Sequence, residues 1–98
     1  MFYTYVLQSY KNNELYIGFT TNLKKRLVEH NRGLNFSTKR YKPWTLVYYE
    51  ACLDELDAKR RENYLKTTQG GRLLKRRLKE FMYKQKSKNL MSRNSTTG

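Results

Sequence analysis

Cysteine and histidine are almost absent from this chain, and their scarcity excludes several kinds of site. The single cysteine, Cys52, has no partner for an internal disulfide and cannot supply the thiolates of a zinc site, which suits a reducing cytoplasm. One histidine and one cysteine cannot by themselves build a transition-metal site. There is also no glycine-rich phosphate loop and no apolar run as long as a membrane span. The sequence therefore predicts a small cytoplasmic protein that does not enter a membrane.

Acidic residues are also few, with 8 aspartates and glutamates against 21 lysines and arginines, so the net charge is +13. This excess predicts a polyanionic partner, with nucleic acid first and an anionic membrane second. Only Asp54, Glu55 and Asp57 cluster, and the start of a helix accounts for them. A two-metal nuclease needs several carboxylates around its ions, so any phosphodiester hydrolysis here would have to use one metal ion.

Three segments carry the aromatic and β-branched residues that are typical of strands. They are residues 2–9, 15–19 and 44–52, and the polar residues 11–14 predict a hairpin turn between the first two. Gly18 in the second strand indicates either a bulge or a place where another group approaches the backbone. These segments predict one small, three-stranded, mainly antiparallel sheet.

Three helices are predicted around this sheet. The first covers residues 23–31, after the possible capping residues 20–22, and the second covers residues 54 to about 67. Gly70-Gly71 is expected to break the chain before the third helix. The apolar face of that helix consists of five residues at helical spacing: Leu73, Leu74, Leu78, Phe81 and Met82.

The order of these elements, β-β-α-β-α-α, predicts an α+β domain in which three helices flank the three-stranded sheet. At 98 residues the chain has room for one domain. We expect residues 1–86 to form it. Residues 87–98 are rich in Ser, Asn and Thr, carry basic side chains and lack apolar periodicity, so they predict a disordered tail.

Two tyrosines and two helical residues are the first candidates for chemistry. Tyr5 and Tyr16 fall on the two hairpin strands, and tyrosines in place of phenylalanines imply partners for their hydroxyls. Arg26 and His30 are spaced i, i+4, so they share a helix face that borders the apolar stripe. Each also has a structural explanation. The tyrosine hydroxyls could lie at the margin of the sheet, His30 could complement the helix dipole, and Arg26 could be a solvated charge.

Glu62 is a further candidate, because it borders the apolar face of the second predicted helix. A carboxylate at this place is either an i, i+4 partner of Lys66 or a ligand for a hard cation. Taken alone, Glu62 favours the first of these two interpretations.

Taken together and in this order, these residues resemble the GIY-YIG nuclease superfamily. The resemblance spans residues 2 to about 80 and is strongest to its small stand-alone branch, which is related to the N-terminal nuclease domain of the bacterial excision-repair incision enzyme. One departure is that the first triplet is Tyr-Thr-Tyr and not Gly-Ile-Tyr. The matching positions are Tyr3-Thr4-Tyr5, Tyr16-Ile17-Gly18, Arg26, His30 and Glu62.

The resemblance implies an endonuclease that hydrolyses DNA with one divalent ion, Mg²⁺ or Mn²⁺, bound by Glu62. Water would complete the coordination of this ion, which would neutralise a phosphate oxygen and stabilise the leaving 3′ oxygen. Arg26 would hold the scissile phosphate with its planar, bidentate donors.

The resemblance also implies a base that deprotonates the attacking water, and three groups are candidates for it: Tyr5, Tyr16 and His30. A free phenol has a pKa of about 10, so a tyrosine in this role needs neighbouring cations. Many members carry an asparagine near the site, for which Gln69 is the candidate here. Gly18 would let a backbone or a ligand come close beside Tyr16.

DNA is the expected partner, including branched or damaged DNA, as in DNA repair. Without a helix-turn-helix or a zinc finger, sequence specificity is expected to be low. Two alternatives are a non-catalytic module that binds DNA or RNA on the same fold, and a ribosome-associated or structural basic protein. The expected phosphate ligands lie in the loop and on the second and third helices: Lys39, Arg40, Lys42, Lys59, Arg60, Arg61, Lys75 and Arg76.

Overall fold

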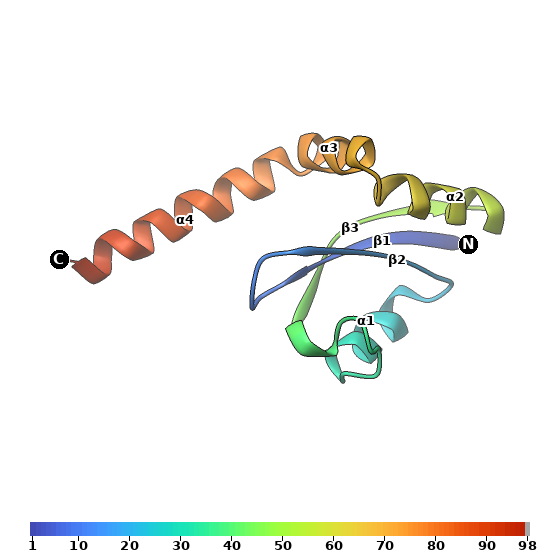
Figure 1. The fold of residues 1–98 in the computed structure, drawn as a ribbon, viewed down its shortest axis with the longest axis horizontal. Coiled ribbons are helices and arrows are strands. Elements are labelled where there is room, and N and C mark those ends of the chain that lie inside the picture. The colour runs from blue at the N-terminus through green and yellow to red at the C-terminus, as the bar shows by residue number, and fades with distance from the viewer. Residues whose placement is uncertain (98) are drawn as a thin grey trace.

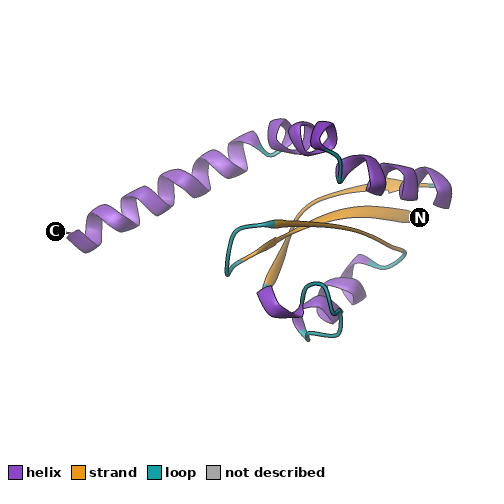
Figure 2. Cartoon of the chain, viewed as in Figure 1, coloured by secondary structure: helices purple, strands orange, loops and turns teal. Residues whose placement is uncertain are grey.

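The sheet consists of three strands, as the sequence predicts. The computed structural model describes the backbone of residues 1–97 and the side chains of residues 1–88. The strands are β1 (Phe2–Ser9), β2 (Leu15–Thr20) and β3 (Trp44–Cys52). Both pairings are antiparallel, and the order β2-β1-β3 places β1 in the centre (Figure 2). The α+β fold class is therefore confirmed.

The helices cover both faces of this sheet (Figure 1). Helix α1 (Leu23–Asn31) packs on one face, and α2 (Glu55–Leu65) and α3 (Thr68–Arg77) pack on the other. A short 3₁₀ turn, η1 (Lys39–Tyr41), lies in the long loop before β3. Helix α4 (Lys79–Thr97) extends away from the sheet and elongates the molecule.

The core divides into two clusters because side chains alternate along β1. Tyr5 and Leu7 point toward α1, where they pack with Trp44 and with partly buried leucines of that helix. Val6, between them, points to the opposite face and packs with residues of α2 and α3. The central strand therefore carries Tyr5 as a buried residue of the α1 side.

The expected break at Gly70-Gly71 is wrong, because both glycines lie within the first turns of α3. The N-cap of this helix is Thr67, whose hydroxyl accepts a hydrogen bond from the Gly70 amide at 3.1 Å. A β-carbon on Gly70 would collide with the carbonyl of Tyr64 and the backbone of Leu65. Gly70 is thus needed where α3 crosses the end of α2, and not as a helix breaker.

The third predicted helix is divided into α3 and α4 at Leu78, and its apolar residues differ in burial. Leu74 and Leu78 are buried, whereas Phe81 is 38% exposed. In α4, Gln85 exchanges two side-chain amide hydrogen bonds with the buried Gln8 of β1, at 2.9 and 3.0 Å. These bonds hold the first turns of α4 against the end of the hairpin.

The backbone of residues 87–97 continues α4 beyond the predicted domain. Neither glycine nor proline occurs between residues 79 and 97, and Lys, Gln, Met and Arg favour helix. The domain boundary at residue 86 stays a prediction, and Gly98 lies outside the described residues. Within the described chain, no helix combines the length and apolarity of a membrane span.

Candidate active site

Tyr5 lies at the centre of the site, and its side chain extends over the edge strand β2. It is 2% exposed and pairs in register with Gly18 of the edge strand β2. A β-carbon at Gly18 would occupy the position of the Tyr5 ring and hydroxyl. Of the two interpretations of Gly18, the structure therefore supports a close approach, and the irregularity of the sheet lies between Val6 and Leu7 on the β3 side.

A chain of hydrogen bonds, here called the Tyr5 network, joins four side chains from β1, α1 and the following loop. Arg26 donates from Nε to the Tyr5 oxygen at 3.2 Å. The same oxygen lies 2.8 Å from Nε2 of His30, and Nδ1 of His30 lies 2.6 Å from the hydroxyl of Thr38. The phenol oxygen is thus fixed between a guanidinium and an imidazole.

Tyr16 borders this network without a hydrogen bond to it among the described residues. It stands opposite Leu7 in the ladder and not opposite Tyr5. Its ring centroid lies 5.2 Å from that of His30 and 6.5 Å from that of Tyr5. The two tyrosines therefore lie diagonally across the hairpin, and both rings lie next to the imidazole.

Local signals place α1 so that two of its turns present Arg26 and His30 to the sheet. The Asn22 side chain caps the helix by accepting from the amide of Lys25 at 3.1 Å. At the other end, Gly33 has φ +74°, a conformation that favours glycine. The Asn31 side chain then accepts from the Trp44 amide at 2.6 Å and donates to its carbonyl at 3.0 Å, which ties α1 to β3.

The environment shifts the pKa of each titratable member of the network. Burial, above all, raises the pKa of Tyr5, and the charges of Tyr16 and Glu62 add to this rise, while Arg26 opposes it. The hydrogen bond to Tyr5 raises the pKa of Arg26. Burial, and then the Arg26 charge, lowers the pKa of His30 to about 4. At neutral pH the phenol and the imidazole are therefore both uncharged.

Glu62 approaches the site from α2, on the other side of the sheet. Its side chain is 19% exposed and pairs with Nζ of Lys66 at 3.1 Å. No hydrogen bond joins it to the Tyr5 network among the side chains of residues 1–88, but its charge contributes to the raised pKa of Tyr5. Among these side chains, the link between Glu62 and the Tyr5 network is therefore electrostatic.

The carboxylates of the site suit one hard cation. Within the described residues no group of three or more His, Cys, Asp and Glu side chains comes together. Glu29 and Glu62 each have one basic partner, Arg26 at 3.5 Å and Lys66 at 3.1 Å. Mg²⁺ binds proteins through one or two carboxylates and keeps several waters. The donor set thus fits a single, largely hydrated ion, which would displace the exposed Lys66.

A hollow of about 300 Å³ opens beside the network on the α1 side. Arg26, Lys25 and Phe19 are among the residues that line it. The Arg26 guanidinium therefore lies between the buried phenol and a space that a phosphate group can enter.

Gln69 is not joined to these groups. It is exposed on the first turn of α3, and no hydrogen bond connects it with the Tyr5 network in the described part of the chain. The structure offers no support for Gln69 as the equivalent of the family asparagine.

Three predicted phosphate ligands lie on α2 and are paired with acids. Lys59 and Arg60 form exposed ion pairs with acids one turn earlier, at 2.9 and 3.2 Å. Such pairs contribute little and exchange readily for phosphate. Arg61 instead lies 3.0 and 3.1 Å from the two oxygens of Glu50 on β3, and both side chains are about three-quarters buried. Arg61 therefore serves as a tie between α2 and the sheet.

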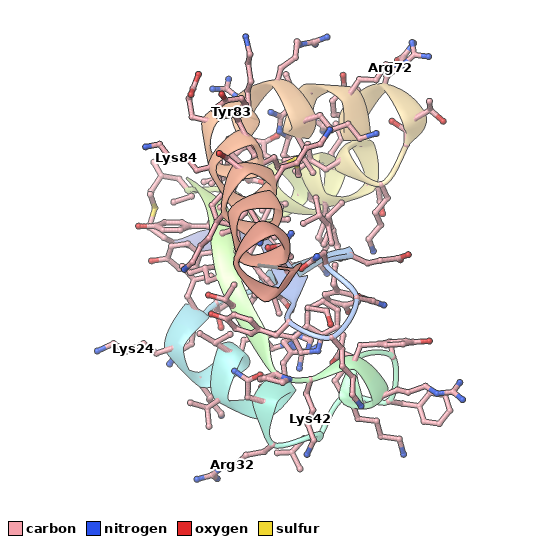
Figure 3. The ribbon with its side chains drawn as sticks, turned by 90° about the vertical axis from the view of Figure 1, so that its left-hand side faces the viewer. Lys24, Arg32, Lys42, Arg72, Tyr83 and Lys84 are labelled. Carbon is pink, nitrogen blue, oxygen red and sulfur yellow. The ribbon has the colours of Figure 1, made fainter. Side chains whose placement is uncertain are left out.

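The remaining predicted phosphate ligands, Lys39, Arg40, Lys42, Lys75 and Arg76, are exposed. Lys39 places its ammonium 5.0 Å from the ring centroid of Phe36. Figure 3 shows Lys24, Arg32 and Lys42 around α1 and the loop that follows it, and Arg72 at the opposite end, beyond α3. Lys24, Arg32 and Arg72 are further exposed cations that were not among the predicted ligands.

Thr38 and Trp44 are members of the site that the sequence does not indicate. Thr38 is fully buried, and its carbonyl accepts a hydrogen bond from the Trp44 indole at 2.9 Å. Thr38 lies in an irregular loop, eight positions after His30, where no periodicity applies. No pattern in the sequence distinguishes it from its neighbours.

A cationic three-stranded α+β fold with a tyrosine, arginine, histidine and glutamate site is the architecture expected of a GIY-YIG nuclease. Residues 1–73 match the GIY-YIG catalytic domain, and the chain belongs to this family.

Small proteins of several bacteria are similar to the chain. The UPF0213 protein SH2523 of Staphylococcus haemolyticus is 41% identical over 66 residues, which cover 66% of this chain and 79% of that protein. The UPF0213 protein CPE1444 of Clostridium perfringens is 40% identical over 67 residues, covering 67% and 71%. No solved structure matches the chain significantly. The family is thus established, while the names of these relatives state no activity.

The low pKa of His30 predicts a loss of stability in acid. The unfolded chain binds a proton to this imidazole near pH 6.5, whereas the folded chain does so only at about pH 4. The contribution of the neutral His30 to the free energy of unfolding is therefore complete above pH 6.5. About 3 kcal/mol of it is lost as the pH falls toward 4. Urea unfolding at pH 7 and pH 4 should show this extra loss in the wild type relative to His30→Gln. Equal losses in both proteins would contradict the burial of a neutral imidazole.

Proposed function

We propose that this protein is an endonuclease that hydrolyses DNA phosphodiester bonds with a single divalent metal ion, Mg²⁺ or Mn²⁺. The observation that supports this proposal is the Tyr5 oxygen held by Arg26 and His30 beside an open hollow. A purely structural tyrosine would not need a partly exposed guanidinium as its partner. The arrangement combines a phosphate ligand and a proton acceptor at one place.

Arg26 is the ligand of the scissile phosphate. Its Nε donates to the Tyr5 oxygen, whereas its terminal nitrogens make only one long contact, 3.5 Å from Nη1 to Glu29. A third of the side chain is exposed, toward the hollow that it lines. Phosphate oxygens would bind these terminal donors with charge-assisted hydrogen bonds, which strengthen as charge grows in the transition state.

Glu62 is the residue that would hold the metal ion. Its carboxylate is mostly buried, acts electrostatically on Tyr5 and is paired with the exposed Lys66. When bound, the ion supplies charge neutralisation at the phosphate and at the leaving oxygen. Tyr5 has a raised pKa in the protein alone, so positive charge near Glu62 would favour the phenolate by removing one of the causes of that rise.

The cationic surface would bind DNA through its phosphates, in the cytoplasm, with little sequence preference. Exposed cations lie around α1, on the loop before β3 and on α3 (Figure 3). Each phosphate that they neutralise releases counterions, so binding should weaken steeply with salt. Branched or damaged DNA is the proposed substrate, because a small fold without a base-reading element selects shape.

Cleavage assays with plasmid and branched DNA test this function. In Mg²⁺ or Mn²⁺, Glu62→Gln should lower the cleavage rate by about 100-fold or more, since the ion loses its carboxylate. Tyr16→Phe should also reduce cleavage, and both variants should still bind DNA. Lys66→Gln is the matched control, because it removes only the partner of Glu62. Undiminished cleavage by Glu62→Gln would indicate a contaminating nuclease or another mechanism.

A non-catalytic module that binds DNA or RNA is the second candidate. It is favoured by the ion pair between Glu62 and Lys66, which occupies the proposed metal ligand, and by the Tyr-Thr-Tyr triplet. DNA binding without cleavage by the wild type, in either metal ion, would support this alternative.

A further inference from the structure

The loop between α1 and β3 holds the ring of Phe36 in solvent. Phe36 is 85% exposed, more than the other three phenylalanines of the chain. A lone exposed apolar side chain is common on protein surfaces and needs no explanation by itself. At Phe36, however, the ammonium of Lys39 lies 5.0 Å from the ring centroid. The ring also lines an open hollow of about 550 Å³, together with Ser37, Lys39, Arg40 and Tyr41.

The charge around Phe36 is of one sign. The sequence has no acidic residue between Glu29 and Glu50. The loop within this segment carries four exposed cations, and Figure 3 shows two of them, Arg32 and Lys42, at the end of the molecule where α1 lies. Leu53 is as exposed as Phe36, at 86%, but the acidic start of α2 follows it directly. Charge complementarity therefore favours an anionic partner at Phe36 and not at Leu53.

Hydrogen bonds fix the backbone on both sides of this aromatic ring. The carbonyl of Asn35, just before it, accepts from the amides of Thr38 and Lys39 at 3.2 and 3.0 Å. After the ring, the hydroxyl of Ser9 on β1 donates to the carbonyl of Tyr41 at 2.6 Å. A segment that is already ordered loses less conformational entropy when it binds a partner. The loop therefore presents the ring to solvent in a preorganised form.

The same loop contacts the Tyr5 network through Thr38, two positions after Phe36. Thr38 is 0% exposed, and its hydroxyl oxygen lies 2.6 Å from Nδ1 of His30. Its carbonyl accepts a hydrogen bond from the indole of Trp44 at 2.9 Å. A ligand on Phe36 would therefore bind to the segment that contacts the candidate active site.

We propose that Phe36 is a stacking platform for an unpaired base of DNA, and that the cations of its loop bind the neighbouring phosphates. An unpaired base exposes a flat face that a duplex keeps stacked inside. Aromatic side chains bind such faces with little regard to sequence, while cations beside them bind the backbone. Lys39 and Arg40 line the same hollow and are the candidates for these phosphates. The inference rests on the proposed function for its choice of DNA, and it narrows the substrate to DNA that carries unpaired bases.

An anionic membrane is the other partner that a cationic loop with an exposed aromatic ring could bind. It is less favoured here, because the Lys39 ammonium lies over the ring. Insertion of the ring into a bilayer would either break this contact or take a charge into an apolar environment, which is costly. Stacking of a base leaves the ammonium in water and beside a phosphate.

Binding without divalent metal ions tests the platform separately from cleavage. In EDTA, fluorescence anisotropy compares a labelled DNA strand with the blunt duplex of the same sequence. Phe36→Ala and Phe36→Leu should each weaken binding of the single strand by about 10-fold or more and that of the duplex much less, because neither keeps a flat ring. Phe36→Trp should retain the wild-type affinity. Leu53→Ala, which removes an equally exposed apolar side chain, is the matched control and should change neither affinity.

Three results would overturn the platform. They are unchanged single-strand binding by Phe36→Ala, an equal loss for strand and duplex, and wild-type affinity in Phe36→Leu. Binding to vesicles of phosphatidylcholine and phosphatidylserine that Phe36→Ala abolishes, with its DNA binding unchanged, would assign the loop to a membrane instead. The expected losses in EDTA, in a protein that does not cut DNA in Mg²⁺ or Mn²⁺, would contradict the proposed function and leave the platform supported.

Discussion

Arg26→Met is expected to lower the rate of DNA cleavage by about 10³-fold or more. Removing one donor that stabilises transition-state charge costs about 10²–10³-fold, and an arginine that neutralises a transferring phosphoryl group contributes about 10³–10⁵-fold. Arg26 does more than contact phosphate, because its Nε also donates to Tyr5. Methionine keeps the unbranched stem of the side chain while losing both interactions. Single-turnover cleavage of branched DNA measures the effect.

The matched control for this loss is Lys24→Met. Lys24 lies on the same helix, carries the same charge and points away from the body of the protein (Figure 3). Its replacement removes one charge from the DNA-binding surface and should change binding and its salt dependence only slightly. If Arg26→Met and Lys24→Met reduced cleavage equally, Arg26 would be an ordinary surface cation and the proposed site would be wrong.

The parts of the fold that the sequence predicts correctly are those with local causes. Alternating aromatic and β-branched residues define β1 and β3, which begin and end at the predicted residues. Helix α1 has its capping side chain at Asn22 and its left-handed residue at Gly33. In each case the determining contact is made within a few residues of the chain.

The sequence does not reveal the features that a distant contact decides. Gly70-Gly71 has the composition of a break, but α2 lies so close that only a glycine fits at position 70. Arg61 has the composition of a phosphate ligand, but Glu50 on β3 binds it.

The residues of the site divide in the same way, into those with local signals and those placed by distant contacts. Tyr5, Arg26 and His30 were identified from the register of a hairpin and the spacing of a helix, and the structure brings them together. Thr38 could not be identified, because its partner is chosen by the path of an irregular loop. Gln69 was assigned by position alone, and no contact in the described residues supports it.

Replacing the two glycines of α3 by alanine is expected to give opposite results. Gly70→Ala would force a methyl group into the backbone of Tyr64 and Leu65, which cannot yield as a flexible side chain would, so the free energy of unfolding should fall by about 3 kcal/mol or more. A β-carbon at Gly71 meets nothing within 4 Å. Gly71→Ala should therefore raise the free energy of unfolding by about 0.5–1 kcal/mol, because alanine favours the helix more than glycine does.

Urea unfolding of the two variants measures this difference. The two positions are adjacent and undergo the same substitution, so each variant is the control for the other. The effect also bears on the site, because α3 packs against the end of the helix that carries Glu62. Gly70→Ala protein that remains folded should therefore cleave more slowly, with the displacement acting on Glu62, while Gly71→Ala should cleave like the wild type. Destabilisation of similar size by both substitutions would show that α3 does not cross α2 at Gly70, and the placement of Glu62 would lose its structural basis.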